Sequence, residues 1–71
     1  MPFTDLIETI KKRRETLQVS QETLAELSGV SLRTLTKFES GKGNPTLSTL
    51  QKLSDVLGLE LTLTVKNLIS N

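Results

Sequence analysis

Glycines and capping hydroxyl residues divide this chain of 71 residues into short segments, which limits what it can fold into. Ser20, Ser31 and Thr46 each precede an amphipathic stretch, where a side-chain oxygen can accept a hydrogen bond from the first free N–H groups of a helix. Gly29 and Gly58 each follow such a stretch, where glycine tolerates the positive φ that ends a helix. The pattern predicts several short helices and excludes one long helix.

Four helices are expected, over residues 4–17, 21–28, 32–40 and 47–57, with Thr4 as the cap of the first. Apolar residues recur at helical spacing within these ranges. The side chains expected to face the core are Phe3, Leu6, Ile7, Ile10, Leu17, Leu24, Leu27, Val30, Leu35, Phe38, Leu47, Leu50, Leu53, Val56 and Leu57.

The period of the apolar residues changes after Gly58. Apolar and polar residues alternate there, which is typical of a half-buried strand, and the apolar members are Leu59, Leu61, Leu63 and Val65. No other stretch of the sequence has this pattern, so the strand has no internal partner. A two-fold axis would pair it antiparallel with a second copy. We therefore expect a dimerisation strand over residues 59–66, the alternative being an extended tail on its own helices.

The composition argues against several classes of function. The chain has no cysteine and no histidine, so disulfides, thiolate chemistry and the usual zinc sites are not expected. General acid or base catalysis would depend on scattered carboxylates and lysines, which makes an enzyme a poor candidate. We expect no catalytic residue, no metal and no cofactor. The sequence shows no signal peptide and no apolar stretch of ~20 residues, so a cytoplasmic protein without membrane association is expected.

The charge distribution says more than the net charge of +1. Most of the nine basic residues lie between positions 11 and 42, namely Lys11, Lys12, Arg13, Arg14, Arg33, Lys37 and Lys42. On its own, this clustering fits an ordinary solvated surface better than a nucleic-acid-binding one.

The segment from Gln21 to Glu39 carries the main functional signal. It predicts two short helices that meet at a glycine turn, with the small Ala25 four residues before Gly29. A small side chain at that point lets the two helices cross closely. This spacing is typical of a helix-turn-helix, whose second helix enters the major groove of DNA.

Residues 10–59 resemble the phage-repressor-like helix-turn-helix family, which includes the lambda and Xre types. The matching motifs are Ile10-Lys-Lys-Arg-Arg14, Val19-Ser-Gln-Glu-Thr-Leu-Ala25, Gly29-Val-Ser31, Phe38-Glu-Ser-Gly-Lys42, Asn44-Pro-Thr-Leu47 and Leu57-Gly58. The resemblance implies an all-α, compact, four-to-five-helix lambda-repressor-like DNA-binding domain. With the strand, this predicts a helix-turn-helix domain over 3–58, a β-strand that pairs across a dimer over 59–66, and a tail over 67–71.

The end of the chain, Leu57-Gly-Leu-Glu-Leu-Thr-Leu-Thr-Val65, is similar to HipB-type antitoxins. That similarity implies a homodimer that represses its own operon at a palindromic double-stranded DNA operator and binds a HipA-like kinase toxin. Two alternatives stay open. One is a protein-interaction module that mainly neutralises a toxin, and the other is a stand-alone phage or Xre-type repressor.

The family resemblance also assigns candidate DNA contacts. The expected base-contacting residues are Ser31, Leu32, Arg33, Thr36 and Lys37. Among them Arg33 is the strongest candidate, because a guanidinium can bridge O6 and N7 of guanine. Leu32 stands where a polar residue is common in the family, and it would suit a thymine methyl group. The alternative for Arg33 is an exposed helix charge.

The expected phosphate contacts, which set position rather than sequence preference, are Gln21, Thr34, Lys42 and Asn44. For Gln21 the alternative is a helix-favouring residue in the first turn. Arg14 and Glu39 match a structural ion pair of the family, in which the planar guanidinium grips a carboxylate. Lys11, Lys12 and Arg13 are interpreted as a solvated face, which is favoured over phosphate contacts.

Overall fold

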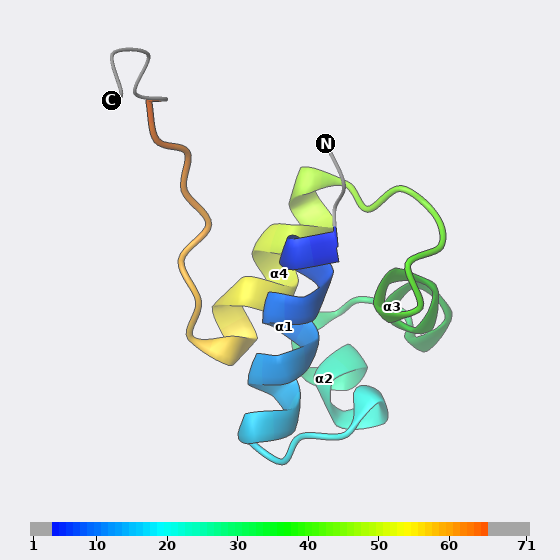
Figure 1. The fold of residues 1–71 in the computed structure, drawn as a ribbon. Coiled ribbons are helices and arrows are strands. Elements are labelled where there is room, and N and C mark those ends of the chain that lie inside the picture. The colour runs from blue at the N-terminus through cyan, green and yellow to red at the C-terminus, as the bar shows by residue number, and fades with distance from the viewer. Residues whose placement is uncertain (1–3, 66–71) are drawn as a thin grey trace.

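The computed structural model describes residues 4–65, and within this range it contains four helices and no strand. The helices are α1 (Thr4–Thr16), α2 (Gln21–Ser28), α3 (Leu32–Glu39) and α4 (Leu47–Leu57). In Figure 1, α1 and α4 lie side by side, α2 crosses below them, and α3 lies to one side. None of the helices within 4–65 is long and apolar enough to span a membrane.

The helix ends follow the local chemistry of the sequence. Ser20, Ser31 and Thr46 each accept a hydrogen bond from the backbone N–H three residues later, which stabilises the starts of α2, α3 and α4. Gly29 and Gly58 adopt left-handed φ values of 77° and 71° and end α2 and α4. The observed ends of α2, α3 and α4 therefore lie within one residue of the predicted ends.

The end of α1 differs slightly from the prediction. The helix stops at Thr16, because Gln18 takes a φ of 58° and the N–H of Val19 donates to the Arg14 carbonyl. Leu17 consequently lies in the turn and is 43% exposed, so its prediction as a core residue was wrong. Thr4, expected as a cap, is already helical.

Within residues 4–65 the core is aliphatic except for the ring of Phe38. Its fully or nearly fully buried side chains are Ile10, Leu24, Ala25, Val30, Leu35, Phe38, Leu50, Leu53 and Leu57. Each buried leucine stabilises the fold by roughly 1.5–3 kcal/mol relative to an exposed one. The core therefore joins all four helices, and α3 is anchored to it through Leu35 and Phe38.

Two further core predictions were wrong. Leu27 is 62% exposed, because Leu24 and Ala25 define the buried face of α2 and Leu27 lies on the other side of Leu24. Leu47 is 76% exposed, because it is the first residue of α4 and projects beyond the region that α1 and α2 cover. Both leucines add apolar surface to the outside of the domain.

Residues 59–65 leave α4 as an extended tail (Figure 1). Leu59 and Leu61 are half-buried against the core, whereas Leu63 and Val65 are 100% and 97% exposed. In the single chain this segment forms no strand, so the expected β-pairing would require a second copy. Phe3, Lys66 and residues 67–71, all included in the sequence predictions, lie outside the described residues.

Candidate nucleic-acid interface

Helix α3 has one buried face and one exposed face. Leu35, Phe38 and Glu39 are buried, while the rest of the helix is exposed, namely Leu32, Arg33, Thr34, Thr36 and Lys37. At a helical period of 3.6 residues, Leu32, Arg33, Thr36 and Lys37 share the outward face. The structure therefore brings four of the five predicted base-contacting residues onto one exposed surface.

The fifth predicted residue, Ser31, is the N-cap of α3. Its Oγ accepts a hydrogen bond from the Thr34 N–H at 3.1 Å and donates one to the Thr34 Oγ1 at 2.9 Å. Both side chains are exposed. Ser31 thus has a definite structural role, because it stabilises the end of α3 that carries Leu32 and Arg33.

A buried polar cluster fixes the orientation of α3 relative to α1 and α2. Arg14 on α1 donates to both carboxylate oxygens of Glu39, from Nε at 2.7 Å and from Nη2 at 2.8 Å. Gln21 on α2 donates from Nε2 to the Glu39 Oε1 at 2.9 Å. The Arg14 Nη1 also donates to the Val19 carbonyl, at 2.8 Å, which holds the turn before α2. We call these residues, Arg14, Gln21 and Glu39, the polar anchor.

The polar anchor stabilises the ionised form of a buried acid. The Glu39 side chain is 3% exposed and that of Arg14 is 12% exposed. Burial alone would raise the pKa of Glu39, but hydrogen bonds from Arg14 and Gln21, with the charge of Arg14, lower it below the ordinary value. The hydrogen bond to Glu39 likewise raises the pKa of the Arg14 guanidinium, although burial opposes this. Both groups therefore stay charged at neutral pH.

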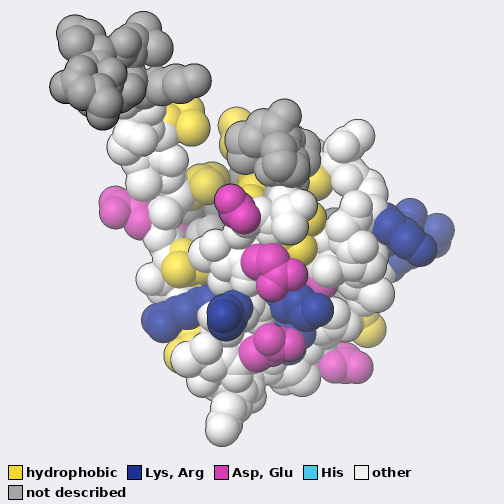
Figure 2. Space-filling view, viewed as in Figure 1, with side chains coloured by type: hydrophobic (Ala, Val, Ile, Leu, Met, Phe, Trp, Pro, Cys, Tyr) yellow, Lys and Arg dark blue, Asp and Glu magenta, His cyan; other side chains and the backbone are white. Residues whose placement is uncertain are grey.

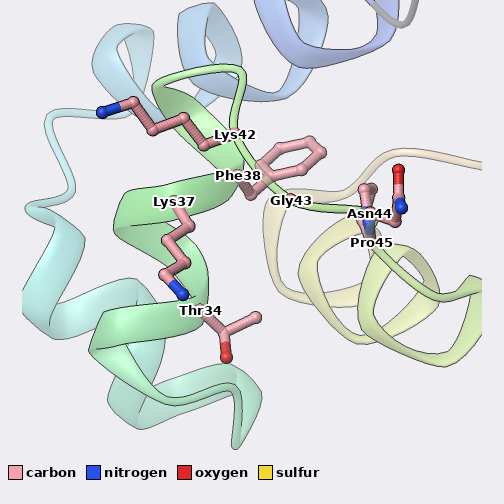
Figure 3. A pocket seen from close by; sticks show the side chains of 7 residues that line it. All are labelled: Thr34, Lys37, Phe38, Lys42, Gly43, Asn44 and Pro45. Carbon is pink, nitrogen blue, oxygen red and sulfur yellow. The ribbon is translucent and has the colours of Figure 1, made fainter.

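Three of the four predicted phosphate-contacting residues lie around one hollow beside α3. This hollow has a volume of about 170 Å³ and is lined by Thr34, Lys37, Phe38, Lys42, Gly43, Asn44 and Pro45 (Figure 3). Its wall on one side is α3 and on the other the α3–α4 loop. A hydrogen bond from the Lys42 N–H to the Lys37 carbonyl, at 2.9 Å, holds the loop against the helix end. Gln21, the fourth predicted residue, lies elsewhere, at the start of α2.

Arg13 has a structural role that the sequence analysis missed. Its Nε donates to the Leu57 carbonyl at 2.8 Å, so a side chain of α1 satisfies a free carbonyl at the end of α4. A cation at this end of a helix is also favoured by the helix dipole. The interpretation of Arg13 as part of a solvated face was wrong. Its contact with Leu57 depends on the packing of α1 against α4, which are far apart in the sequence.

The charged surface over α1 is mixed. Figure 2 shows acidic and basic side chains next to one another across the middle of this face. Hydrophobic side chains are exposed near the tail (Figure 2). Leu47, Leu61, Thr62 and Leu63 line an apolar hollow of about 340 Å³. The basic, outward face of α3 and the apolar tail are therefore separate features of the surface.

The capped α2–turn–α3 pair, with an exposed polar face on its second helix, defines a helix-turn-helix domain. The chain belongs to the helix-turn-helix family of the Xre and lambda-repressor type, whose family model matches residues 10–63. This match spans the whole of α2, α3 and α4 and extends into the tail.

Three relatives of this chain are transcriptional regulators or repressors by name, and two of these names specify the helix-turn-helix type. The SPbeta prophage-derived uncharacterized regulator YonR of Bacillus subtilis is 40% identical over 73% of this chain and 48% of its own length. The cryptic phage CTXphi transcriptional repressor RstR of Vibrio cholerae is 33% identical over 76% of this chain and 48% of its length. An uncharacterized regulator of Haemophilus influenzae is 42% identical over 87% of this chain and 66% of its length. The chain spans about half the length of the first two.

Proposed function

We propose that this protein is a sequence-specific DNA-binding transcriptional regulator that acts as a repressor by holding α3 in the major groove. One observation carries the proposal. Leu32, Arg33, Thr36 and Lys37 form an exposed face on a helix whose opposite face is anchored by Leu35, Phe38 and Glu39. Such a helix can be inserted into a groove without any rearrangement of the core. A regulator of this kind works at the nucleoid, in the cytoplasm.

Base recognition depends on the outward face of α3. Arg33 would donate to O6 and N7 of a guanine, a contact worth roughly 1–3 kcal/mol of discrimination. Leu32, which is 41% exposed, would contact a thymine methyl group. Ser31, Thr36 and Lys37 would contact neighbouring base edges. This division agrees with the arrangement in which the N-terminal part of a recognition helix approaches the bases.

Phosphate contacts would hold the helix in position. Thr34, Lys42 and Asn44 surround the hollow beside α3, which is open to solvent and carries the charges of Lys37 and Lys42. Gln21 would contact a phosphate at the start of α2 while it keeps its hydrogen bond to Glu39. Contacts of this kind fix the register of the protein on the duplex.

The protein would act as a homodimer on a palindromic operator. The tail supports this, because Leu63 and Val65 are almost completely exposed, and Leu63 lines one hollow with the exposed Leu47 and the half-buried Leu61. Antiparallel pairing of residues 59–66 with a second copy would cover this apolar surface and satisfy the unpaired backbone groups. Two copies would place their α3 helices one turn of B-DNA apart, roughly 34 Å.

The relatives favour a stand-alone repressor over an antitoxin. Two of the three come from phages or prophages, and one is named a repressor. Neither the relatives nor the described residues point to a HipA-like toxin, so the antitoxin hypothesis stays a prediction of the sequence. A kinase gene adjacent to this one, and co-purification of its product with this chain, would favour that hypothesis.

The direct test of the proposed function is a binding selection from a pool of random duplexes, followed by sequencing. A palindromic motif with two half-sites is expected. The control is a variant in which Arg33 and Lys37 are both replaced by alanine. This variant keeps the Leu35 and Phe38 side chains that anchor α3, so only the proposed recognition face is changed. Enrichment of no motif by the parent chain would contradict the proposed function.

A further inference from the structure

A second hollow lies on the other flank of α3 and joins three helices. It has a volume of about 220 Å³ and is lined by Lys11, Arg14, Gln21, Thr36, Glu39 and Ser40. Successive residues in a helix are about 100° apart, so Thr36 and Ser40 lie on the side of α3 opposite Thr34 and Phe38. The hollow with Lys42 and the hollow with Lys11 therefore border the outward face of α3 from its two sides.

Lys11 supplies the excess charge of this second hollow. Arg14 and Glu39 neutralise each other through their paired hydrogen bonds. Within residues 4–65 the one salt bridge is this Arg14–Glu39 pair, so the ammonium group of Lys11 is not neutralised by a carboxylate there. Lys11 is half-buried, and its long methylene chain can lie along α1 while the charged group reaches the solvent.

The polar anchor lines this hollow with a carboxylate that is already paired. Glu39 accepts three hydrogen bonds, from Arg14 and Gln21, so its carboxylate oxygens are already occupied. Lys11 lines the same hollow as Arg14, Gln21 and Glu39, so its side chain lies beside the anchor. An anion in this hollow would meet Lys11 together with the polar side chains of Gln21, Thr36 and Ser40, and it would also face the Arg14–Glu39 pair, whose charges offset each other.

A helix in the major groove has a sugar-phosphate backbone on each side of it. On one side of α3, Thr34, Lys42 and Asn44 provide the proposed phosphate contacts, including a cation. On the other side the sequence provided only the neutral Gln21. We propose that Lys11 binds a backbone phosphate of the second DNA strand, beside Gln21, so that each flank of α3 contributes one lysine. This inference depends on the proposed function, since it names a further contact of the same DNA site.

The test compares Lys11 with its neighbour. Lys12 is exposed, carries the same charge on the same helix and does not line the hollow, so Lys12→Ala is a matched control. Binding to a fluorescein-labelled duplex of mixed sequence is measured by anisotropy at several KCl concentrations, for the parent, Lys11→Ala, Lys11→Gln, Lys11→Arg and Lys12→Ala. Thermal unfolding of each variant, followed by circular dichroism, accompanies the titrations, and Lys11→Gln retains most of the packing of the lysine chain.

Lys11→Ala and Lys11→Gln are expected to make the negative slope of log K against log[salt] shallower by about 0.9 for each bound protomer, the value for one phosphate contact. Lys11→Arg should restore the slope, and Lys12→Ala should change it much less. Equal slopes for the parent, Lys11→Ala and Lys11→Gln would overturn the inference. The inference would also fail if Lys12→Ala changed the slope as much as Lys11→Ala does, because that result indicates a general effect of charge. If the parent itself shows no salt-dependent binding, the proposed function fails as well.

Discussion

Replacing Glu39 with alanine should destabilise the domain strongly, because it breaks the buried ion pair with Arg14. The substitution leaves the Arg14 guanidinium, whose side chain is 12% exposed, without its carboxylate, and it removes the acceptor of Gln21. Breaking a buried ion pair by removing one partner costs 3–5 kcal/mol. Arg14 keeps its bond to the Val19 carbonyl and some contact with water, so the loss should be about 3 kcal/mol.

That loss is large for a domain of this size, because the total stability of such a chain is on the order of 5 kcal/mol. Urea denaturation, followed by circular dichroism, measures the free energy of unfolding, and thermal scans should show the melting temperature falling by roughly 12–24 °C. Glu26→Ala removes an exposed acid from α2 and should cost less than about 0.5 kcal/mol. It controls for the change in net charge.

A double-mutant cycle separates the ion pair from the packing of its members. The variant Arg14→Met with Glu39→Leu removes both charges, and it should unfold less readily than Glu39→Ala alone, because no buried charge is left without a partner. A loss in Glu39→Ala below about half a kcal/mol would refute the reasoning. The reasoning would also be refuted if the double variant lost as much free energy of unfolding as the single variants Arg14→Met and Glu39→Leu lose in total.

Four further predictions concern binding, assembly and pH. Arg33→Ala should weaken binding to the selected operator by roughly 1–3 kcal/mol and relax specificity at one base pair per half-site, and affinities for single-base variants of the operator would check this. Lys42→Ala should instead lower affinity for all sequences and reduce the salt slope by about one phosphate contact, so anisotropy titrations that reveal a base-selective loss would contradict the assignment. A chain ending at Gly58 should be monomeric in sedimentation and should bind the operator far more weakly than the intact chain, because linking two half-sites raises the affinity. A truncated chain that still dimerises and binds equally tightly would exclude the tail as the interface. The pKa of Glu39 is lower in the folded chain than its ordinary value of 4.5. The stability that comes from its ionised form is therefore present above that value and is lost as the pH falls through the folded pKa. In Glu39→Gln this part of the acid-induced loss of stability should disappear, which urea denaturation between neutral and acidic pH would show.

The helix boundaries could be predicted because they depend on neighbouring residues. A serine or threonine at a helix start and a glycine at its end act within one turn, and Ser20, Ser31 and Gly29 do so here. The end of α1 was less accurate, because a glutamine, Gln18, takes the positive φ that usually indicates glycine. A helix end can thus be predicted from neighbouring residues when the residue at that end is of a type that favours the φ and ψ angles found there.

The burial of individual apolar residues could not be predicted as well. Leu27 and Ala25 are both compatible with an inward face of α2, and the choice depends on the angle at which α2 meets α3 and α4. The contact of Arg13 with the Leu57 carbonyl joins residues far apart in the chain, and no local pattern indicates it. The place of Lys11 beside Gln21 likewise follows only from how α1 packs against α3.

The candidate DNA contacts came from the family resemblance, and the structure adds their arrangement. Spacing alone places Arg33 and Lys37 on one face of a helix, but it does not show that Lys42 and Asn44 border the same hollow as Thr34. The tail is different again, because alternation of apolar and polar residues predicts an extended segment without indicating its partner. Residues 59–65 are extended in the single chain, and their pairing is a property of two chains.

The two faces of α3 have separate tasks, which affects how this protein could change its target. Within residues 4–65 the side chains of Leu32, Arg33, Thr36 and Lys37 make no hydrogen bond or ion pair with the rest of the fold, and only the backbone carbonyl of Lys37 accepts a side-chain hydrogen bond, from Ser40. Surface substitutions of this kind usually alter stability by no more than about 0.5 kcal/mol. Under the proposed function, the preference for an operator would therefore diverge by substitutions at these four positions while the scaffold remains intact.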